Sequence, residues 1–491
     1  MNFSYKNIHH KYLLSLLISI FFLFPNCLLF STDDISISNN SDSLSYLMTN
    51  QAGDGRYTFS LILSLMQFFS TDYDSFLIIS FITMSLSLVI LFYSISRSFF
   101  EISNRAEFFG FLVFVSFGPS LDLYQFTNAY LSYGVGIISV SGVITIATGS
   151  RNPGFRLALC SLLAFIGLGS YQTVGQLLLI AAASLLVIPR LTNTSDEIRS
   201  KLLRAAAIIV TATIIGGGLY LTTNLMLKFA AVPGFENYPA RQQGLHFVLK
   251  NIPKYADTLG TLLQWGPSLY APLMPVVWRL AFTMIMIWTL FEILKNRVVG
   301  WPIAILGMAA AIALWPNPAN MILSYYWPSA RTLFGFAPFF GMLCAALFCL
   351  SERTSSEAKR WPIGILFLST LVFGQCALAT IRYQDRFVQQ TADFSLAQSI
   401  LVKAYETYRV DESIEIKLGV SCCAVGIAKQ GVLDYRISLF GTSWSAPALL
   451  EYISGHRVSA RMAGPNECNA NLDRITYEKQ SDGFLVCIRS S

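Results

Sequence analysis

Two adjacent carboxylates, Asp33 and Asp34, follow directly after an apolar run that ends at residue 30. They lie where a helix would leave the membrane, next to the lipid headgroups. Neighbouring carboxylates repel each other, so one of the two is expected to have a raised pKa. Such a group suits a general base, which takes up and releases a proton near the working pH. The pair therefore predicts proton transfer at the outer surface of a membrane.

The sequence "GDGR" (residues 53–56) is a second candidate. Two glycines favour a tight turn, and Asp54 and Arg56 either pair with each other or face a ligand. The surrounding loop, residues 31–74, contains six Asp and, as its one basic residue, Arg56. An acidic loop of this kind could hold a divalent metal. No fixed ligand spacing is present, so neither a metal nor another cofactor is assigned.

Cations in or beside apolar runs form the third group. Arg279 lies inside "APLMPVVWRLAFTMIMIW". A charge there costs about 2.5–3.5 kcal/mol at a helix centre, so it either faces a cavity or reaches outward to the interface. Arg331, in "YYWPSARTLFGF", either anchors the following span or clamps a phosphate, which fits a planar guanidinium. His246 and Lys250 are four residues apart and share a helix face; a solvated amphipathic helix is the default expectation there.

The composition places these residues on a polytopic membrane protein. Of 491 residues, 54% are hydrophobic and 13% are charged, whereas soluble domains contain roughly 25% charged residues. The net charge of +6 is small for this length, and no basic face with interleaved aromatic residues is present, which argues against a nucleic-acid partner.

Apolar runs predict an all-α membrane domain with about eleven transmembrane helices. The run 157–189 suggests a pair of short or broken helices with "GSYQTVG" (169–175) at their turn, and 57–70 suggests a helix lying on the membrane. The expected spans are near 12–30, 75–95, 108–123, 131–149, 157–171, 172–189, 205–226, 271–294, 301–316, 332–350 and 362–380.

Basic residues in the loops give the orientation, because cytoplasmic loops are rich in Lys and Arg. The N-terminus is then cytoplasmic, the loops 31–74 and 227–270 lie outside, and an odd number of spans places the C-terminus outside as well. In a Gram-negative cell this outer side is the periplasm.

A soluble domain is expected at residues 381–491, after a membrane domain of residues 1–380. The tail contains 12 basic and 12 acidic residues, so the preceding part carries the whole +6. Its start reads as helix, and "IEIKLGV" and "GFLVCI" read as strands, which predicts a small α+β domain. Its four cysteines suggest two disulfides in an exported domain: Cys422 and Cys423 each pair with Cys468 or Cys487, and the sequence does not say which.

No Walker A, HExxH or GxSxG motif is present, and acidic residues are few within the spans. ATP-driven transport and proton relay through the mid-bilayer are therefore disfavoured. The outer carboxylates favour chemistry at the outer leaflet on a lipid-linked substrate.

A series of motifs completes the pattern. An N-terminal span precedes "STDD" (31–34), "GDGR" (53–56), "SYQT" (170–173) and "SARTL" (329–333). Their order and spacing resemble the Gtr-type, serotype-converting O-antigen glucosyltransferases of bacteria and their phages, over roughly residues 10–385. The resemblance implies a GT-C fold with a catalytic carboxylate in the first outer loop.

It also implies an inverting transfer of a sugar, usually glucose, from a polyprenyl-phosphate donor to an O-antigen, lipid-linked or on lipopolysaccharide. The location implied is the periplasmic side of the bacterial inner membrane, with a flippase and a polyprenyl-phosphate-sugar synthase as functional partners. The implied site comprises a base, Asp33 or Asp34; phosphate ligands, Arg331, Arg56 and Arg279; and sugar ligands, Asp54, Tyr171 and Gln172.

Two alternatives of other classes remain. A lipid-linked oligosaccharide flippase or small-solute transporter would normally show internal repeats and a site near the membrane centre, and no repeat is found. A surface polysaccharide polymerase or ligase typically has a large outer loop late in the chain, of which 227–270 could be a small version.

Overall fold

The computed structural model divides into two compact units, each described by itself. The larger comprises Met1–Phe24, Met48–Tyr124 and Ala129–Ala379, and the smaller comprises Pro25–Leu47, Gln125–Asn128 and Thr380–Ser491. The structure describes residues 5–29, 34, 37, 42–98, 102–117, 123–124, 126–192, 194–236, 238, 244, 246–265, 275–295, 301–324, 326, 333–354, 361–408, 414–420, 439–441, 445–455, 458–463, 475–480 and 483–488. Within these ranges, the backbone is described without the side chains at residues 5–9, 264–265, 275–279, 353–354, 361–370, 378, 382, 420 and 441.

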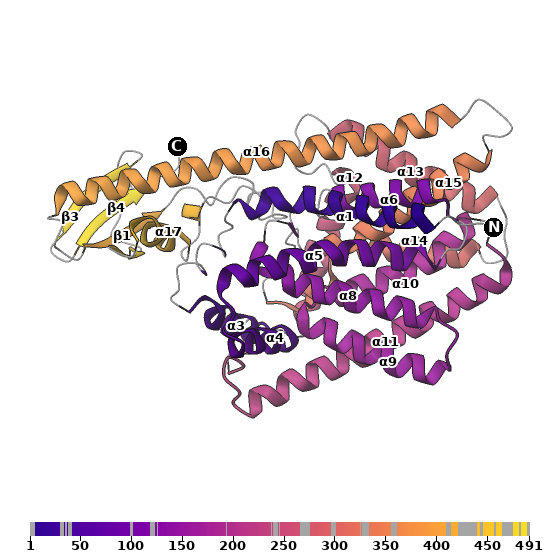
Figure 1. Cartoon of the computed structure of the whole chain (residues 1–491), viewed down its shortest axis with the longest axis horizontal. Helices are drawn as coiled ribbons and strands as arrows, with labels where there is room; N and C mark the ends of the chain where they lie inside the picture. The colour runs from indigo at the N-terminus through magenta and orange to yellow at the C-terminus, as the bar shows by residue number, and fades with distance from the viewer. Residues whose placement is uncertain are drawn as a thin grey trace. The chain divides into compact units, whose positions relative to one another are not determined.

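The larger unit is a bundle of apolar helices (Figure 1). Helix α5 packs against α8, α8 against α9, α9 and α10 against α11, and α6 against α15. The helices are α1 (Tyr5–Cys27), α3 (Ser43–Gly53), α4 (Tyr57–Phe68), α5 (Tyr73–Ser96), α6 (Asn104–Ser116), α8 (Tyr130–Ala147), α9 (Pro153–Ser170), α10 (Val174–Leu191), α11 (Asp196–Phe229), α12 (His246–Trp265), α13 (Pro275–Lys295), α14 (Trp301–Ala313), α15 (Ala337–Thr354) and α16 (Trp361–Thr407), with short 3-10 turns η1 (Thr127–Ala129), η3 (Pro318–Ile322) and η5 (Phe334–Phe336).

The expected all-α polytopic membrane protein is confirmed. Every predicted span overlaps a helix. Among the described residues, seven helices are long and apolar enough to cross a membrane; the total of about eleven for the whole chain stays a prediction. Helices α6 and α14 have 13 residues each, or about 20 Å at 1.5 Å per residue, which is short of a bilayer core of about 30 Å.

The run 157–189 forms two unbroken helices of 18 residues, α9 and α10. Asn152 caps α9, accepting a hydrogen bond from the N–H of Gly154, and Pro153 occupies the first turn, where its missing N–H is harmless. Tyr171–Thr173 form the turn between the helices, at the place expected. The expectation of short or broken helices was wrong because the turn needs only three residues, which leaves a full span on each side.

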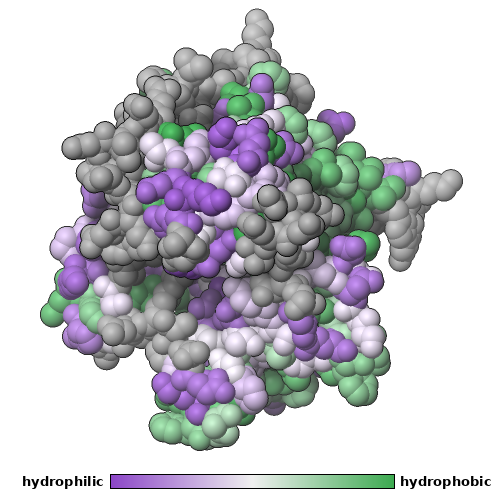
Figure 2. Space-filling model, turned by 90° about the vertical axis from the view of Figure 1, so that its left-hand side faces the viewer, coloured by the Kyte–Doolittle hydropathy of each residue, from purple (hydrophilic) through white to green (hydrophobic). Residues whose placement is uncertain are grey.

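Apolar side chains cover much of the outer surface of these helices, for example Ile78 of α5, Ile214 of α11 and Ile287 of α13. Figure 2 shows apolar patches reaching the surface beside hydrophilic ones. In helix α4, Leu61 and Phe68 are exposed on one face, while Phe59 is buried on another. Such faces suit contact with lipid; that α4 lies on the membrane stays a prediction.

The smaller unit contains a four-stranded sheet of order β2-β1-β4-β3. The strands are β1 (Ile414–Val420), β2 (Val458–Met462), β3 (Ile475–Gln480) and β4 (Gly483–Ile488). Strand β1 is parallel to β2 and β4, and β3 is antiparallel to β4. Both expected strands, "IEIKLGV" and "GFLVCI", are present as β1 and β4, so the predicted α+β character of the tail is confirmed.

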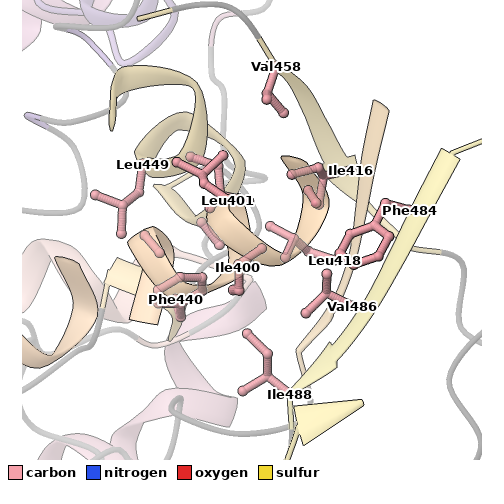
Figure 3. Close-up of a cluster of buried hydrophobic side chains, with 14 of the residues drawn as sticks. Ile400, Leu401, Ile416, Leu418, Phe440, Leu449, Val458, Phe484, Val486 and Ile488 are labelled. Atoms are coloured by element: carbon pink, nitrogen blue, oxygen red, sulfur yellow. The ribbon is translucent and has the colours of Figure 1, made fainter. Parts of the chain in front are cut away.

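One apolar core holds this unit together (Figure 3). Alternate residues of β1 point into it, as expected of a strand with one buried face, and α16 contributes residues at helical spacing. Helix α17 (Ser445–Ser454) and the 3-10 turn η7 (Leu439–Gly441) close it. The buried set includes Ala397, Ile400, Leu401, Ala404, Ile414, Ile416, Leu418, Phe440, Leu449, Leu450, Phe484, Val486 and Ile488.

Cysteine usage follows the division expected. Cys487 of β4 is disulfide-bonded, and Cys422, Cys423 and Cys468 lie outside the described residues. The five cysteines of the apolar helices are not in disulfide bonds: Cys27, Cys160, Cys344, Cys349 and Cys376.

Truncating Ile416 to Ala should destabilise the tail domain by about 2–5 kcal/mol, because Ile416 is fully buried and the cavity cannot be refilled. Pulse proteolysis of the purified chain across a urea series measures this. The matched control is Val402→Ala on the exposed side of α16, expected to change stability by less than about 0.5 kcal/mol. Equal effects of the two variants would show that β1 is not in the core.

Candidate functional site

Asp34 is a buried carboxylate, with 3% of its surface exposed. Its Oδ1 accepts a hydrogen bond of 3.2 Å from the backbone N–H of Asn128, a residue of η1 directly before α8. An N–H donor stabilises a carboxylate in its ionised form, the form that can accept a proton. Asp33 lies outside the described residues. A catalytic role for Asp34 stays a prediction, and the residue belongs to the smaller unit.

The "GDGR" residues form the turn between α3 and α4. Gly55 has φ +79, a conformation that glycine adopts without strain. The N–H of Gly55 donates to Ala52 O (2.8 Å), and the N–H of Arg56 donates to Gln51 O (2.9 Å). A Cβ on Gly55 would lie 2.6 Å from Tyr238 Cε2 and 2.9 Å from the Tyr220 hydroxyl. Backbone conformation and close packing therefore both require glycine at this position.

Arg56 is the centre of this region. Its Nη2 forms an ion pair of 3.5 Å with Asp54 Oδ2, its Nη1 donates to Gln51 Oε1, and its Nε donates to Gln172 Oε1 (3.4 Å). The guanidinium carbon lies 4.8 Å from the centre of the Tyr171 ring, a cation–π distance. Of the two possibilities left open by the sequence, Asp54 and Arg56 pair with each other.

Gln172 connects the α9–α10 turn to the "GDGR" turn. Its Nε2 donates to the backbone carbonyl of Asp54 (2.5 Å) and to the Tyr220 hydroxyl (3.2 Å). Tyr171 packs edge-on against Tyr133, with ring centres 4.3 Å apart. Segments more than 100 residues apart in the sequence are thus joined through two consecutive side chains.

Tyrosines enclose the turn. The Tyr57 hydroxyl donates to Phe165 O (2.5 Å), and Tyr220 and Tyr238 are hydrogen-bonded to each other. Burial raises the pKa of both Tyr57 and Tyr238, so both stay neutral at pH 7 and keep their hydroxyl protons.

The structure therefore brings together four of the predicted site residues, Asp54, Arg56, Tyr171 and Gln172. The side chains of Asp54 and Arg56 remain 35% and 13% exposed. These groups are a carboxylate, a guanidinium and an amide beside tyrosine rings. Such polar groups can form hydrogen bonds with the hydroxyl groups of a sugar.

Two predicted cations cannot be placed in this way. Arg279 lies in α13, where the backbone alone is described, and Arg331 lies outside the described residues. Gln176 of α10 donates from Nε2 to the carbonyls of Leu314 and Trp315, both at 2.7 Å, and packs against Gly335, four residues after Arg331 in the sequence. A phosphate-binding role for the arginines stays a prediction.

A small apolar cavity of about 10 Å³ lies beside Tyr171, between α8, α10 and η5. It has room for about one water molecule, so it is not a sugar pocket in this conformation. In the part of the chain that the structure describes, no three His, Cys, Asp or Glu side chains gather as a metal site would require.

Sequence reasoning missed Gln51, Tyr133, Tyr220 and Tyr238. Gln51 precedes the turn by two residues, and its nearness to Arg56 in the sequence could have suggested their contact. Tyr220 lies within the 34-residue helix α11, and no local sequence pattern distinguishes it from other tyrosines.

No protein-family model and no curated protein matches the sequence. Among solved structures, the chain is similar to the archaeal oligosaccharyltransferase AglB from Archaeoglobus fulgidus, in complex with an inhibitory peptide and a dolichol-phosphate. The identity is 11%, the TM-score is 0.40, and the match covers 92% of this chain and 69% of AglB. A TM-score this low does not establish a common fold, so no conclusion about fold or activity is based on it.

Replacing Gly55 by Ala should displace the turn, because a Cβ would meet Tyr238 and the positive φ would strain alanine. The expected loss is about 1–3 kcal/mol of local stability, measured as faster hydrogen–deuterium exchange in residues 51–58. Gly217→Ala in α11, where a Cβ meets nothing within 4 Å, is the control and should leave exchange unchanged. Slow exchange in both variants would contradict the described turn.

Proposed function

We propose that the chain is an inverting membrane glycosyltransferase of the GT-C type. It would move a sugar, with glucose as the first candidate, from a polyprenyl phosphate to an O-antigen or other surface polysaccharide on the outer face of the inner membrane. The observation that carries the proposal is Asp34: a buried carboxylate seven residues after an apolar helix long enough to span a membrane, which accepts a hydrogen bond from a backbone N–H.

In the proposed reaction, Asp34 or Asp33 removes the proton from an acceptor hydroxyl. The resulting oxygen attacks the anomeric carbon, and the bond from that carbon to the phosphate oxygen breaks. Polyprenyl phosphate leaves with the bonding electrons, and the carboxyl group later releases its proton to water. A single displacement inverts the anomeric centre.

The leaving phosphate gains charge in the transition state, so a preorganised cation near it accelerates the reaction. Arg331 is the first candidate, and Arg56 and Arg279 follow. Arg56 is already held by Asp54, Gln51 and Gln172, so its charge is fixed in position before substrate arrives. Asp54, Tyr171 and Gln172 are proposed to hydrogen-bond the sugar.

The disulfide at Cys487 supports the outward orientation of the tail, because disulfides persist in oxidising compartments such as the periplasm. The apolar helices are long enough to cross a membrane, and the prenyl chain of the donor would lie in that membrane. A flippase and a polyprenyl-phosphate-sugar synthase would deliver the donor to that side. A donor of this kind carries its own leaving group, so the proposed reaction needs no nucleotide.

Asp34→Asn should lower transfer by about 10²–10⁴-fold, the usual contribution of a general base, because an amide cannot accept the proton. The measurement is product formation by the purified protein in nanodiscs, from a short-chain polyprenyl-phosphate glucose and an O-antigen acceptor. Asp74→Asn is the control: Asp74 is an exposed acid of the same loop and should retain full activity. Undiminished transfer by Asp34→Asn and Asp33→Asn alike would exclude the proposed mechanism, as a flippase would predict.

A further inference from the structure

Helix α12 (His246–Trp265), in the second predicted outer loop, has a distribution of side chains that the proposed reaction does not explain. Its residues divide into three stripes along the helix axis. One stripe is buried against the rest of the larger unit and includes Asn251, Thr258 and Leu262. The other two stripes face outward and differ sharply in chemistry.

The buried stripe binds the backbone of residues 313–323. Asn251 donates from Nδ2 to the carbonyls of Met321 (2.9 Å) and Leu323 (2.7 Å). The Tyr255 hydroxyl lies within hydrogen-bond distance of the carbonyls of Pro316 (2.7 Å) and Ala313. The side chains of α12 therefore fix the position of the chain between α14 and η5.

The first outward stripe is apolar. Leu249, Ile252 and Leu263 are 78%, 47% and 41% exposed, and Ala256 is exposed on the same side. At about 100° per residue these positions share one side of the helix. In water, a stripe of exposed aliphatic side chains along a whole helix is unfavourable.

The second outward stripe is polar and basic. His246, Lys250 and Lys254 follow each other at a spacing of four residues and are all exposed. Asp257 is the acidic residue of this stripe. A helix that crossed a bilayer would have no reason to keep such a stripe along its length.

We propose that α12 lies parallel to the membrane, in the outer leaflet of the bilayer that the protein crosses. Its apolar stripe would then be in the acyl region, and Lys250 and Lys254 would be at the phosphates of anionic phospholipids. A boundary that runs lengthwise between apolar and basic stripes places the helix axis parallel to the boundary between lipid and water. Lysine suits this position because its aliphatic stem lies in lipid while its ammonium reaches the headgroups. The helix would thereby hold residues 313–323 at headgroup depth.

The test uses the full-length protein in nanodiscs of phosphatidylcholine and phosphatidylglycerol. Bimane is attached to Leu249→Cys or, as the matched control on the basic stripe, to Asp257→Cys. Both are made in a Cys27→Ser background, because the Cys27 thiol is exposed, and the signal of that parent is subtracted. Ile252→Cys replaces Leu249→Cys should the latter fail to purify as a single species.

Lipids brominated in the acyl chains should quench the label at position 249 about twofold more than the label at position 257. Aqueous iodide should quench them in the opposite order. Efficient iodide quenching at position 249 would show a solvated helix, and equal lipid quenching at both positions would show a spanning one. Protection of position 249 from both quenchers would show that protein covers the stripe. Each of these results would overturn the proposal.

A second comparison tests the anionic headgroup. A small fraction of brominated phosphatidylglycerol should quench position 249 about twofold more than the same fraction of brominated phosphatidylcholine, because lysines enrich anionic lipid around them. Lys250→Gln with Lys254→Gln should abolish the excess, and Lys201→Gln with Lys295→Gln should leave it. Absence of the excess in the parent would refute the headgroup assignment. All of these readouts are independent of sugar transfer, so their failure leaves the proposed function untouched, and the converse also holds.

Discussion

A guanidinium that is withdrawn from water needs acceptors around it, since an unpaired buried charge is strongly destabilising. At Arg56 this requirement is met by Asp54, Gln51 and Gln172 and by the face of Tyr171. Those residues come from two segments that are distant in the sequence. The contacts of Arg56 with them therefore connect the α3–α4 turn to the α9–α10 turn. The positive φ of Gly55 and its close contact with Tyr238 follow from the same tight arrangement.

The proposed chemistry needs polar groups that are held in position before the substrate binds. The proposed base must be ionised before the acceptor arrives, and Asp34 accepts a hydrogen bond from the N–H of Asn128. Fixed polar groups also lower the reorganisation needed when charge develops in a transition state. The apolar helices of the larger unit then have two tasks: they position Arg56 and its partners Asp54, Tyr171 and Gln172, and they offer an apolar outer surface. Helix α12, placed at the headgroups, would add a third, by setting the depth of residues 313–323.

Sequence patterns predicted the helices well because apolar length is a local property, and they predicted β1 and β4 because buried strands consist largely of apolar residues. They misplaced some span ends because hydropathy does not show where a helix ends: α6 stops at Ser116, within the expected span 108–123. They missed β2 and β3, edge strands of mixed composition that are held by backbone hydrogen bonds. The motifs "GDGR" and "SYQT" were found, but their contact and the role of Tyr220 depend on tertiary packing that no local spacing encodes.

The central claim is that a hexose is transferred to a surface polysaccharide outside the cell. Mass spectrometry of the polysaccharide repeat unit, from otherwise identical cells with and without the gene, tests it most directly. The account predicts a repeat unit heavier by one hexose when the protein is present in the membrane. Identical repeat masses in cells that contain the protein, its lipid-linked donor and its acceptor would contradict it.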